Sequence, residues 1–100
     1  MNLFFDTNVI LDYLIPTNSF HEEASKILKA VFEGKANGFI SAHSMTDIFY
    51  ISRKYFSLED GLQMRCAENA KLDYIVTENL KDFKTSKVPA LAISSALSKI

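Results

Sequence analysis

The sequence predicts an α/β fold: a three-layer α/β/α arrangement with a mainly parallel sheet of about four short strands. Two observations indicate this class. Short apolar runs typical of buried strands alternate along the chain with segments whose apolar residues recur at helical spacing. Polar residues that commonly cap helices stand at the changes from strand to helix. Strands that are separated by helices pair in parallel, because each crossover returns the chain to the same end of the sheet.

One strand and two helices are expected in the first 34 residues. The apolar run Asn2–Phe5 predicts a strand, and Asp6–Asn8 marks its turn into a short helix that Pro16 ends. A capping box at Ser19–Glu22 predicts a longer helix that ends near Gly34. Its apolar side chains follow amphipathic helical spacing: Ala24, Ile27, Leu28, Val31 and Phe32.

A second strand and two further helices are expected in the middle of the chain. The strand is predicted at Gly38–Ser41. A helix capped by Ser41 or Ser44 should run to about Tyr55. A capping box that begins at Ser57 predicts the next helix, which should run to about Lys71 and carry Cys66 on its inward face.

The last 30 residues are expected to add two strands and a short helix. The β-branched run Tyr74–Thr77 predicts a central strand, and Glu78–Lys87 reads as a polar, lysine-bearing loop. A weaker strand follows at Ala90–Ile93, and Ser94 or Ser95 should cap a final helix. These elements complete the alternation of strands and helices.

Composition limits the classes of function. The chain has 100 residues and a net charge of −1, so no strongly basic surface indicates nucleic-acid binding. The first 50 residues carry 3 basic and 6 acidic side chains and the last 50 carry 8 and 6, so a polyanion would more readily meet the second half. Cys66 is the only cysteine, which excludes an internal disulfide and fits a reducing cytoplasm. No apolar run is long enough for a membrane span, and the N-terminus does not resemble a signal peptide.

Acidic and amide side chains fall where ligands bind in a parallel sheet, beyond the carboxyl ends of the strands. Asp6 ends the first strand, Asp47 lies early on the helix after the second, and Asp60 opens the helix before the Tyr74–Thr77 strand. Asn79 and Asp82 follow that strand. Carboxylates without histidine or cysteine suit Mg²⁺ or Mn²⁺. Such an ion can activate water and hold a phosphate for in-line displacement.

Each of these residues also has a purely structural interpretation. Asp6 and its two neighbours are typical helix caps, and Asp60 is the acidic member of its capping box. Asp47 suits the positive end of a helix dipole, while Asn79 and Asp82 suit an ordinary turn. The shared placement at one edge of the sheet favours a site over these separate explanations.

Basic side chains flank the same edge. Three lysines, Lys81, Lys84 and Lys87, form the best local basic patch, although a solvated loop explains them about as well. Arg53 and Lys54 follow Asp47 and are placed to meet a phosphate backbone.

Three stretches resemble one family. FFDTNVILDYL is similar to the opening of the PIN-domain ribonucleases, the fold of the VapC-type toxins. FISAHSMTDIFYISRK resembles their second strand and the helix with the second acid, and LEDGLQMRCAENAKLDYIVTENLKDF resembles their C-terminal signature. Together the stretches cover most of residues 1–93 and imply a single PIN-like domain over residues 1–100.

The resemblance implies a metal-dependent endoribonuclease that hydrolyses RNA phosphodiester bonds. Its acids map to Asp6, Asp47 and Asp60, while the fourth position falls on Asn79 with Asp82 as the substitute. The implied ligands of Mg²⁺ or Mn²⁺ are Asp6, Asp60 and Asp82. Other matching positions support the acids or face the substrate: Thr7, Asn8, Thr46, Tyr50 and Arg53.

The resemblance also implies partners. Family members of this type are toxins whose antitoxin covers the active site with its tail, and many form homodimers. This chain departs from the family pattern between Ser57 and Leu58, where a further helix, strand and helix are normally found. A second hypothesis follows from that gap: a non-catalytic, shortened PIN-like protein that acts as an interaction module. A receiver-like phospho-acceptor domain is a third interpretation, but the chain lacks the paired acids and the late lysine that it needs.

Overall fold

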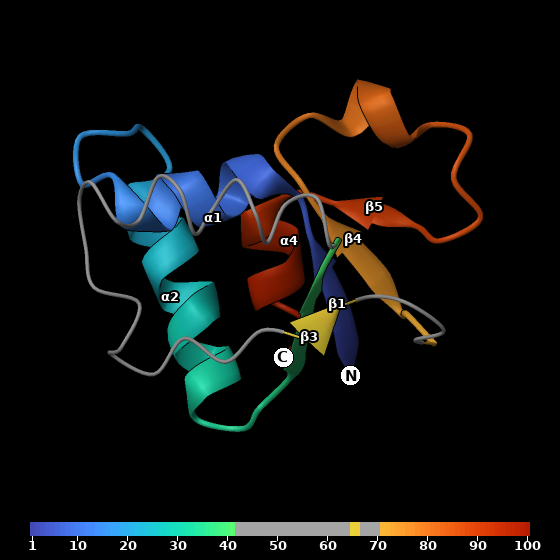
Figure 1. Cartoon of the computed structure of the whole chain (residues 1–100), viewed down its shortest axis with the longest axis horizontal. Helices are drawn as coiled ribbons and strands as arrows, with labels where there is room; N and C mark the ends of the chain where they lie inside the picture. Colours follow the sequence, from blue (N-terminus) through green and yellow to red (C-terminus); the bar gives the residue numbers. More distant parts are fainter. Residues whose placement is uncertain (42–64, 67–70) are drawn as a thin grey trace.

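A parallel sheet forms the centre of the protein. The structure, a computed structural model, describes residues 1–41, 65–66 and 71–100. Within them a five-stranded sheet has the order β3-β2-β1-β4-β5, and every pairing is parallel (Figure 1). The strands are β1 (Asn2–Phe5), β2 (Asn37–Ile40), β3 (Arg65–Cys66), β4 (Tyr74–Val76) and β5 (Ala90–Leu91). The predicted α/β class with a parallel sheet is confirmed.

The central strand β1 places its side chains alternately on the two faces of the sheet. Leu3 and Phe5 are fully buried on the face that meets the helices. Phe4 lies between them and is in register with Phe39 of β2 and Ile75 of β4, so these three side chains form a row on the other face. The helix predicted to run to about Tyr55 and most of the helix predicted from Ser57 fall within residues 42–64 and 67–70, outside the described residues.

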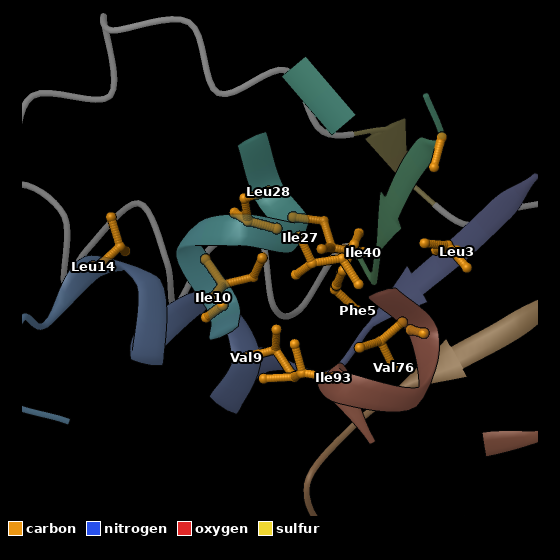
Figure 2. Packing of buried hydrophobic residues seen from close by; sticks show 13 residues of the cluster. Leu3, Phe5, Val9, Ile10, Leu14, Ile27, Leu28, Ile40, Val76 and Ile93 are labelled. Atoms are coloured by element: carbon orange, nitrogen blue, oxygen red, sulfur yellow. The ribbon is translucent and has the colours of Figure 1, made fainter. Parts of the chain in front are cut away.

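Helices α1 (Thr7–Leu14), α2 (His21–Phe32) and α4 (Ile93–Leu97) pack together over the face that carries Leu3 and Phe5 (Figure 1). Their buried side chains meet in one hydrophobic cluster with β1, β2 and β4 (Figure 2). The largest fully buried aliphatic side chains from the helices are Val9, Ile10, Ile27, Leu28 and Ile93. Each contributes about 1.5–3 kcal/mol through its burial. This core holds α1, and therefore the residue that precedes it, against the end of the sheet.

At the two ends of α2, the structure has one of the two predicted caps. Gly34 follows the helix with φ +78°, and the amide of Lys35 donates to the carbonyl of Ala30 at 3.0 Å. This is the glycine-terminated C-cap that the sequence predicts. The predicted capping box at the other end is wrong, because α2 begins at His21 after Phe20 and no side chain caps it. The helix packs its apolar side chains Ala24, Ile27 and Leu28 into the core.

The predicted helix from Ser57 to Lys71 is wrong at Arg65–Cys66. These two residues form β3, in parallel register with Phe39 and Ile40 at the edge of β2. Local capping signals cannot reveal that β2 has an open edge whose backbone groups need partners. The strand therefore lies where the sequence suggests helix.

The last helix also starts differently from the prediction. Helix α4 begins at Ile93, so Ser94 and Ser95 lie within it rather than capping it. Between β4 and β5 the polar loop contains one short 3₁₀ helix, η2 (Leu80–Phe83). Across the part of the chain that the structure describes, no helix is long and apolar enough to cross a membrane.

Candidate active site

Asp6 lies at the carboxyl end of the central strand. Its amide donates to the carbonyl of Val76 in β4 at 3.1 Å, which extends the pairing of β1 and β4 by one residue. Its carbonyl accepts the amide of Val9 at 3.0 Å, in the first turn of α1. With φ −63° and ψ 145°, Asp6 is the extended residue that joins strand to helix. Its backbone is therefore fixed on both sides.

The Asp6 side chain does not cap α1. The N-terminus of α1 has no side-chain cap, and Oδ2 of Asp6 accepts a hydrogen bond from Oγ1 of Thr77 at 2.9 Å. This geometry counts against the interpretation of Asp6 as a simple helix cap. A carboxylate has about four lone-pair positions, so one donor leaves room for a cation.

Thr77 is the buried residue that positions Asp6. It is fully buried, and its amide donates to the carbonyl of Leu91 in β5 at 2.9 Å. Its hydroxyl oxygen accepts the amide of Asn79 at 2.9 Å. Because an amide can only donate, the hydroxyl proton is free to point to Asp6. Thr77 thus donates to the carboxylate with a fixed orientation.

The two predicted residues after β4 are bonded to each other. The side-chain amide of Asn79 donates to Oδ2 of Asp82, and the amide of Asp82 donates to the carbonyl of Asn79 at 3.1 Å. Both residues are exposed. With the bond from Asn79 to Thr77, a continuous chain of hydrogen bonds joins Asp82 to Asp6.

Glu78, which lies between Thr77 and Asn79, is bonded to helix α4 instead of to these hydrogen-bonded residues. Its Oε1 accepts the amide of Ile93 at 2.9 Å, at the N-terminus of α4. The carboxylate therefore fills the role that Ser94 or Ser95 was expected to play. As a result, three successive residues, Thr77 to Asn79, are each tied to a different part of the protein.

Asp12 is an acid near Asp6 that the sequence interpretation did not single out. It lies on α1, and its Oδ1 accepts the side-chain amide of Asn18 at 3.2 Å. Burial raises the pKa of the Asp12 carboxyl above its ordinary value, the bond from Asn18 opposes that rise, and the charge of Asp6 adds to it. The negative charge of Asp6 is therefore one of the causes of the raised pKa of Asp12.

The structure brings together only part of the predicted set. Asp6 is joined to Asn79 and Asp82, Thr7 opens α1, and Asn8 is exposed on its first turn. Five predicted positions lie outside the described residues: Thr46, Asp47, Tyr50, Arg53 and Asp60. Residues 1–41, 65–66 and 71–100 contain no group of three or more acidic, histidine or cysteine side chains that could hold a metal.

Two residues that interact with Asp6 were missed in the sequence. Thr77 was read as the last residue of a strand, and only its position after three apolar residues, beside a polar turn, could have drawn attention to it. Asp12 follows Asn8 by one helical turn, so it shares that side of α1. That spacing is a usable signal, but it does not reveal the distance to other acids.

The donor chemistry of the described residues fits a hard divalent cation. Asp6 supplies a carboxylate, and Asp82 supplies a second that is linked to it by hydrogen bonds. Carboxylate and water oxygens are the ligands of Mg²⁺ and Mn²⁺. Two carboxylates without further ligands bind such an ion weakly, so the described residues alone do not make a complete metal site.

Comparison with known proteins identifies the class. A family model described as PIN domain matches residues 2–63, more than half of the chain. The chain therefore belongs to the PIN domain family, and its 100 residues are consistent with a shortened member. PIN domains are generally nucleases that act on RNA and use divalent metal ions. Comparisons with curated proteins and with solved structures found no match.

Proposed function

We propose that this protein is a metal-dependent endoribonuclease and the toxin component of a toxin–antitoxin pair. The observation that carries the proposal is the Asp6 carboxylate, held by buried Thr77 at the carboxyl end of the central strand. Ligands bind at this end in parallel sheets. Membership of the PIN domain family supports a nuclease at that position.

We propose that residues 1–100 form one PIN-like domain with an acidic site around Asp6. Asp6, Asp60 and Asp82 hold Mg²⁺ or Mn²⁺ when the metal is bound. Asp47 completes the acidic group or orients water. A bound divalent cation lowers the pKa of its water and neutralises charge on the phosphate.

The protein's own residues position the reactants in this proposal. Thr77 fixes the orientation of the Asp6 carboxylate, and Asn79 fixes Asp82. The oxygen of water forms a bond to phosphorus in line with the leaving ribose oxygen, and the P–O bond to the ribose oxygen breaks. The attacking water gives up one proton and the leaving oxygen takes up one, so the products are a phosphate end and a hydroxyl end. Supporting contacts to RNA and to the acids come from Thr7, Asn8, Thr46, Arg53 and Asn79.

Cleavage of a labelled RNA with Mg²⁺ or Mn²⁺ tests this function. The Asp6→Asn variant keeps the shape of the side chain but removes its charge, so we expect at least a 100-fold loss of rate. Asp73→Asn is the matched control, because Asp73 is exposed and accepts the amide of Asn2 at the amino end of the strands. That variant should cleave normally. The same cleavage assay tests the remaining proposed acids with the variants Asp47→Asn, Asp60→Asn and Asp82→Asn.

Thermal denaturation with increasing Mg²⁺ separates metal binding from catalysis. A ligand at 100 times its Kd stabilises the folded state by about 2.7 kcal/mol, which corresponds to a rise of roughly 10 °C or more for a chain of this size. The rise should disappear in Asp6→Ala and persist in Asp73→Asn. Equal rises in both variants would place the metal elsewhere.

The alternative function is a non-catalytic interaction module. The absence of cleavage with either metal, in a wild-type protein that still binds a partner, would favour that alternative. Co-purification with a small protein encoded beside the gene tests the antitoxin, and sedimentation at several concentrations tests the homodimer. A cytoplasmic location remains part of the proposal and rests on the single cysteine, Cys66, which fits a reducing compartment.

A further inference from the structure

A loop rich in lysine begins directly at the candidate site. We call residues 79–89 the lysine loop, because they contain Lys81, Lys84 and Lys87, all of them exposed. Figure 1 shows the loop, with η2 at its tip, extending from the end of β4 beyond the sheet and returning to β5. It therefore presents three cations on a segment that leaves the core.

The two described acids at the start of the lysine loop, Glu78 and Asp82, form hydrogen bonds with uncharged groups and no ion pair with a loop lysine. Glu78 is bonded to the amide of Ile93, and Asp82 is bonded to the side chain of Asn79. Within the part of the chain that the structure describes, the one ion pair joins Lys35 to Glu33. Residues 79–89 carry three lysines and one acid, Asp82, so the lysine loop has a net charge of +2 in a protein whose net charge is −1.

The local geometry places two of the lysines on one side of a turn. Lys81 lies in η2, and Lys84 continues it with helical angles of φ −58° and ψ −33°. Residues three apart in a 3₁₀ helix eclipse each other, so Lys81 and Lys84 extend along the same side. Neighbouring ammonium groups of this kind suit successive phosphates, which a lysine meets as a point charge.

The lysine loop is also connected to Asp6 through two hydrogen bonds of the Thr77 hydroxyl. Its first residue, Asn79, donates its amide to Thr77, whose hydroxyl donates to Asp6. A phosphodiester at Asp6 would therefore have its neighbouring phosphates near this loop. We propose that the lysine loop binds the sugar–phosphate backbone of RNA on one side of the bond at Asp6. This inference rests on the proposed function for the identity of the polyanion.

Binding of RNA without cleavage tests the inference. The full chain carrying Asp6→Asn is titrated, in EDTA, into a fluorescein-labelled single-stranded oligouridylate at several salt concentrations. In this background, Lys81→Gln/Lys84→Gln/Lys87→Gln is compared with Lys26→Gln/Lys29→Gln/Lys35→Gln, which removes the same charge from α2 and the residues after it. Thermal melts of both triple variants check folding.

The salt dependence gives the expected size of the effect. Each phosphate contact contributes about 0.7 to the slope of log K against log salt for a single strand. If all three loop lysines contact phosphate, the slope falls by about 2 and the affinity near 0.1 M salt falls roughly 100-fold. The α2 variant should stay within about threefold of the parent. Equal losses in both variants, or an unchanged slope in the loop variant, would overturn the inference.

Two further arms keep this inference separate from the proposed function. A fluorescent polyglutamate peptide is titrated in the same way. If it binds through the lysine loop and RNA does not, the ligand of the loop is an acidic protein segment and the inference about RNA is wrong. A wild-type protein that fails to cleave, although its RNA binding depends on the loop, would refute the nuclease and leave this inference standing. Cleavage that persists with binding independent of the loop would refute this inference alone.

Discussion

Replacement of Thr77 by valine tests whether its hydroxyl organises the candidate site. Valine has nearly the shape of threonine, so the packing of this fully buried side chain is preserved while both of its hydrogen bonds are lost. A hydrogen bond to a charged group contributes about 1.5–3 kcal/mol, and an amide left without a partner adds to the loss. Water can reach the exposed Asn79, so we expect a total loss of about 2–3 kcal/mol.

Thr77→Ser is the matched control for this change. Serine keeps the hydroxyl and loses one buried methyl group, which costs about 1 kcal/mol. Urea denaturation at pH 7 should therefore give the order of stability wild type, Thr77→Ser, Thr77→Val. For a chain of this size, the valine variant should melt about 10 °C below the wild type.

The order of stability of Thr77→Ser and Thr77→Val shows whether the hydroxyl group of Thr77 or only its volume stabilises the protein. If Thr77 served only to fill the core, valine would be the better replacement and would be at least as stable as serine. A double-mutant cycle with Asp6→Ala adds a second measure, with an expected coupling of about 1.5 kcal/mol or more. A coupling near zero would refute the hydrogen bond to Asp6. In RNA cleavage, serine should restore most of the rate that valine loses.

Three further changes test other contacts. Because burial raises the pKa of Asp12, its protonation stabilises the fold fully below the ordinary value of 3.8, and that contribution is lost as pH rises through the folded-state pKa. Asp12→Asn should therefore gain stability over the wild type at pH 7 but not at pH 3, as measured by urea denaturation. Glu78→Ala should lower the free energy of unfolding by about 1 kcal/mol through loss of the cap on α4, and Glu78→Gln should lose less than half as much. Gly34→Ala should cost about 1 kcal/mol in thermal melts, because φ is +78° there although no atom lies within 4 Å of an added Cβ.

The fold was predictable where local pattern and tertiary contacts agree. β1, α1 and α2 follow from apolar spacing and from Gly34, and the structure has them at nearly the predicted residues. β3 was not predictable, since its strand state depends on the open edge of β2. The start of α4 was missed for a similar reason, because its cap comes from a residue 15 positions earlier in the chain.

The candidate site was predictable in its location but only partly in its contacts. Strand ends in a parallel sheet converge, so Asp6 and the Asn79–Asp82 turn could be placed at one edge from the sequence. The sequence could not show that Asp6 accepts from Thr77 instead of capping α1, because the cap is a local pattern whereas Thr77 lies 71 positions further along the chain. Thr77 became visible only once β1 and β4 were paired.

The contact of Glu78 with α4 has a consequence for the start of the lysine loop. This carboxylate lies next to the lysine loop in the chain, yet it is bonded to the backbone of Ile93 at 2.9 Å. The short C-terminal helix therefore fixes the position of this carboxylate, which keeps its negative charge. A chain cut before Ile93 would lose this bond together with the buried side chains of Ile93 and Ala96, so it would disturb the start of the loop although none of the removed residues belongs to the loop or to the acidic site.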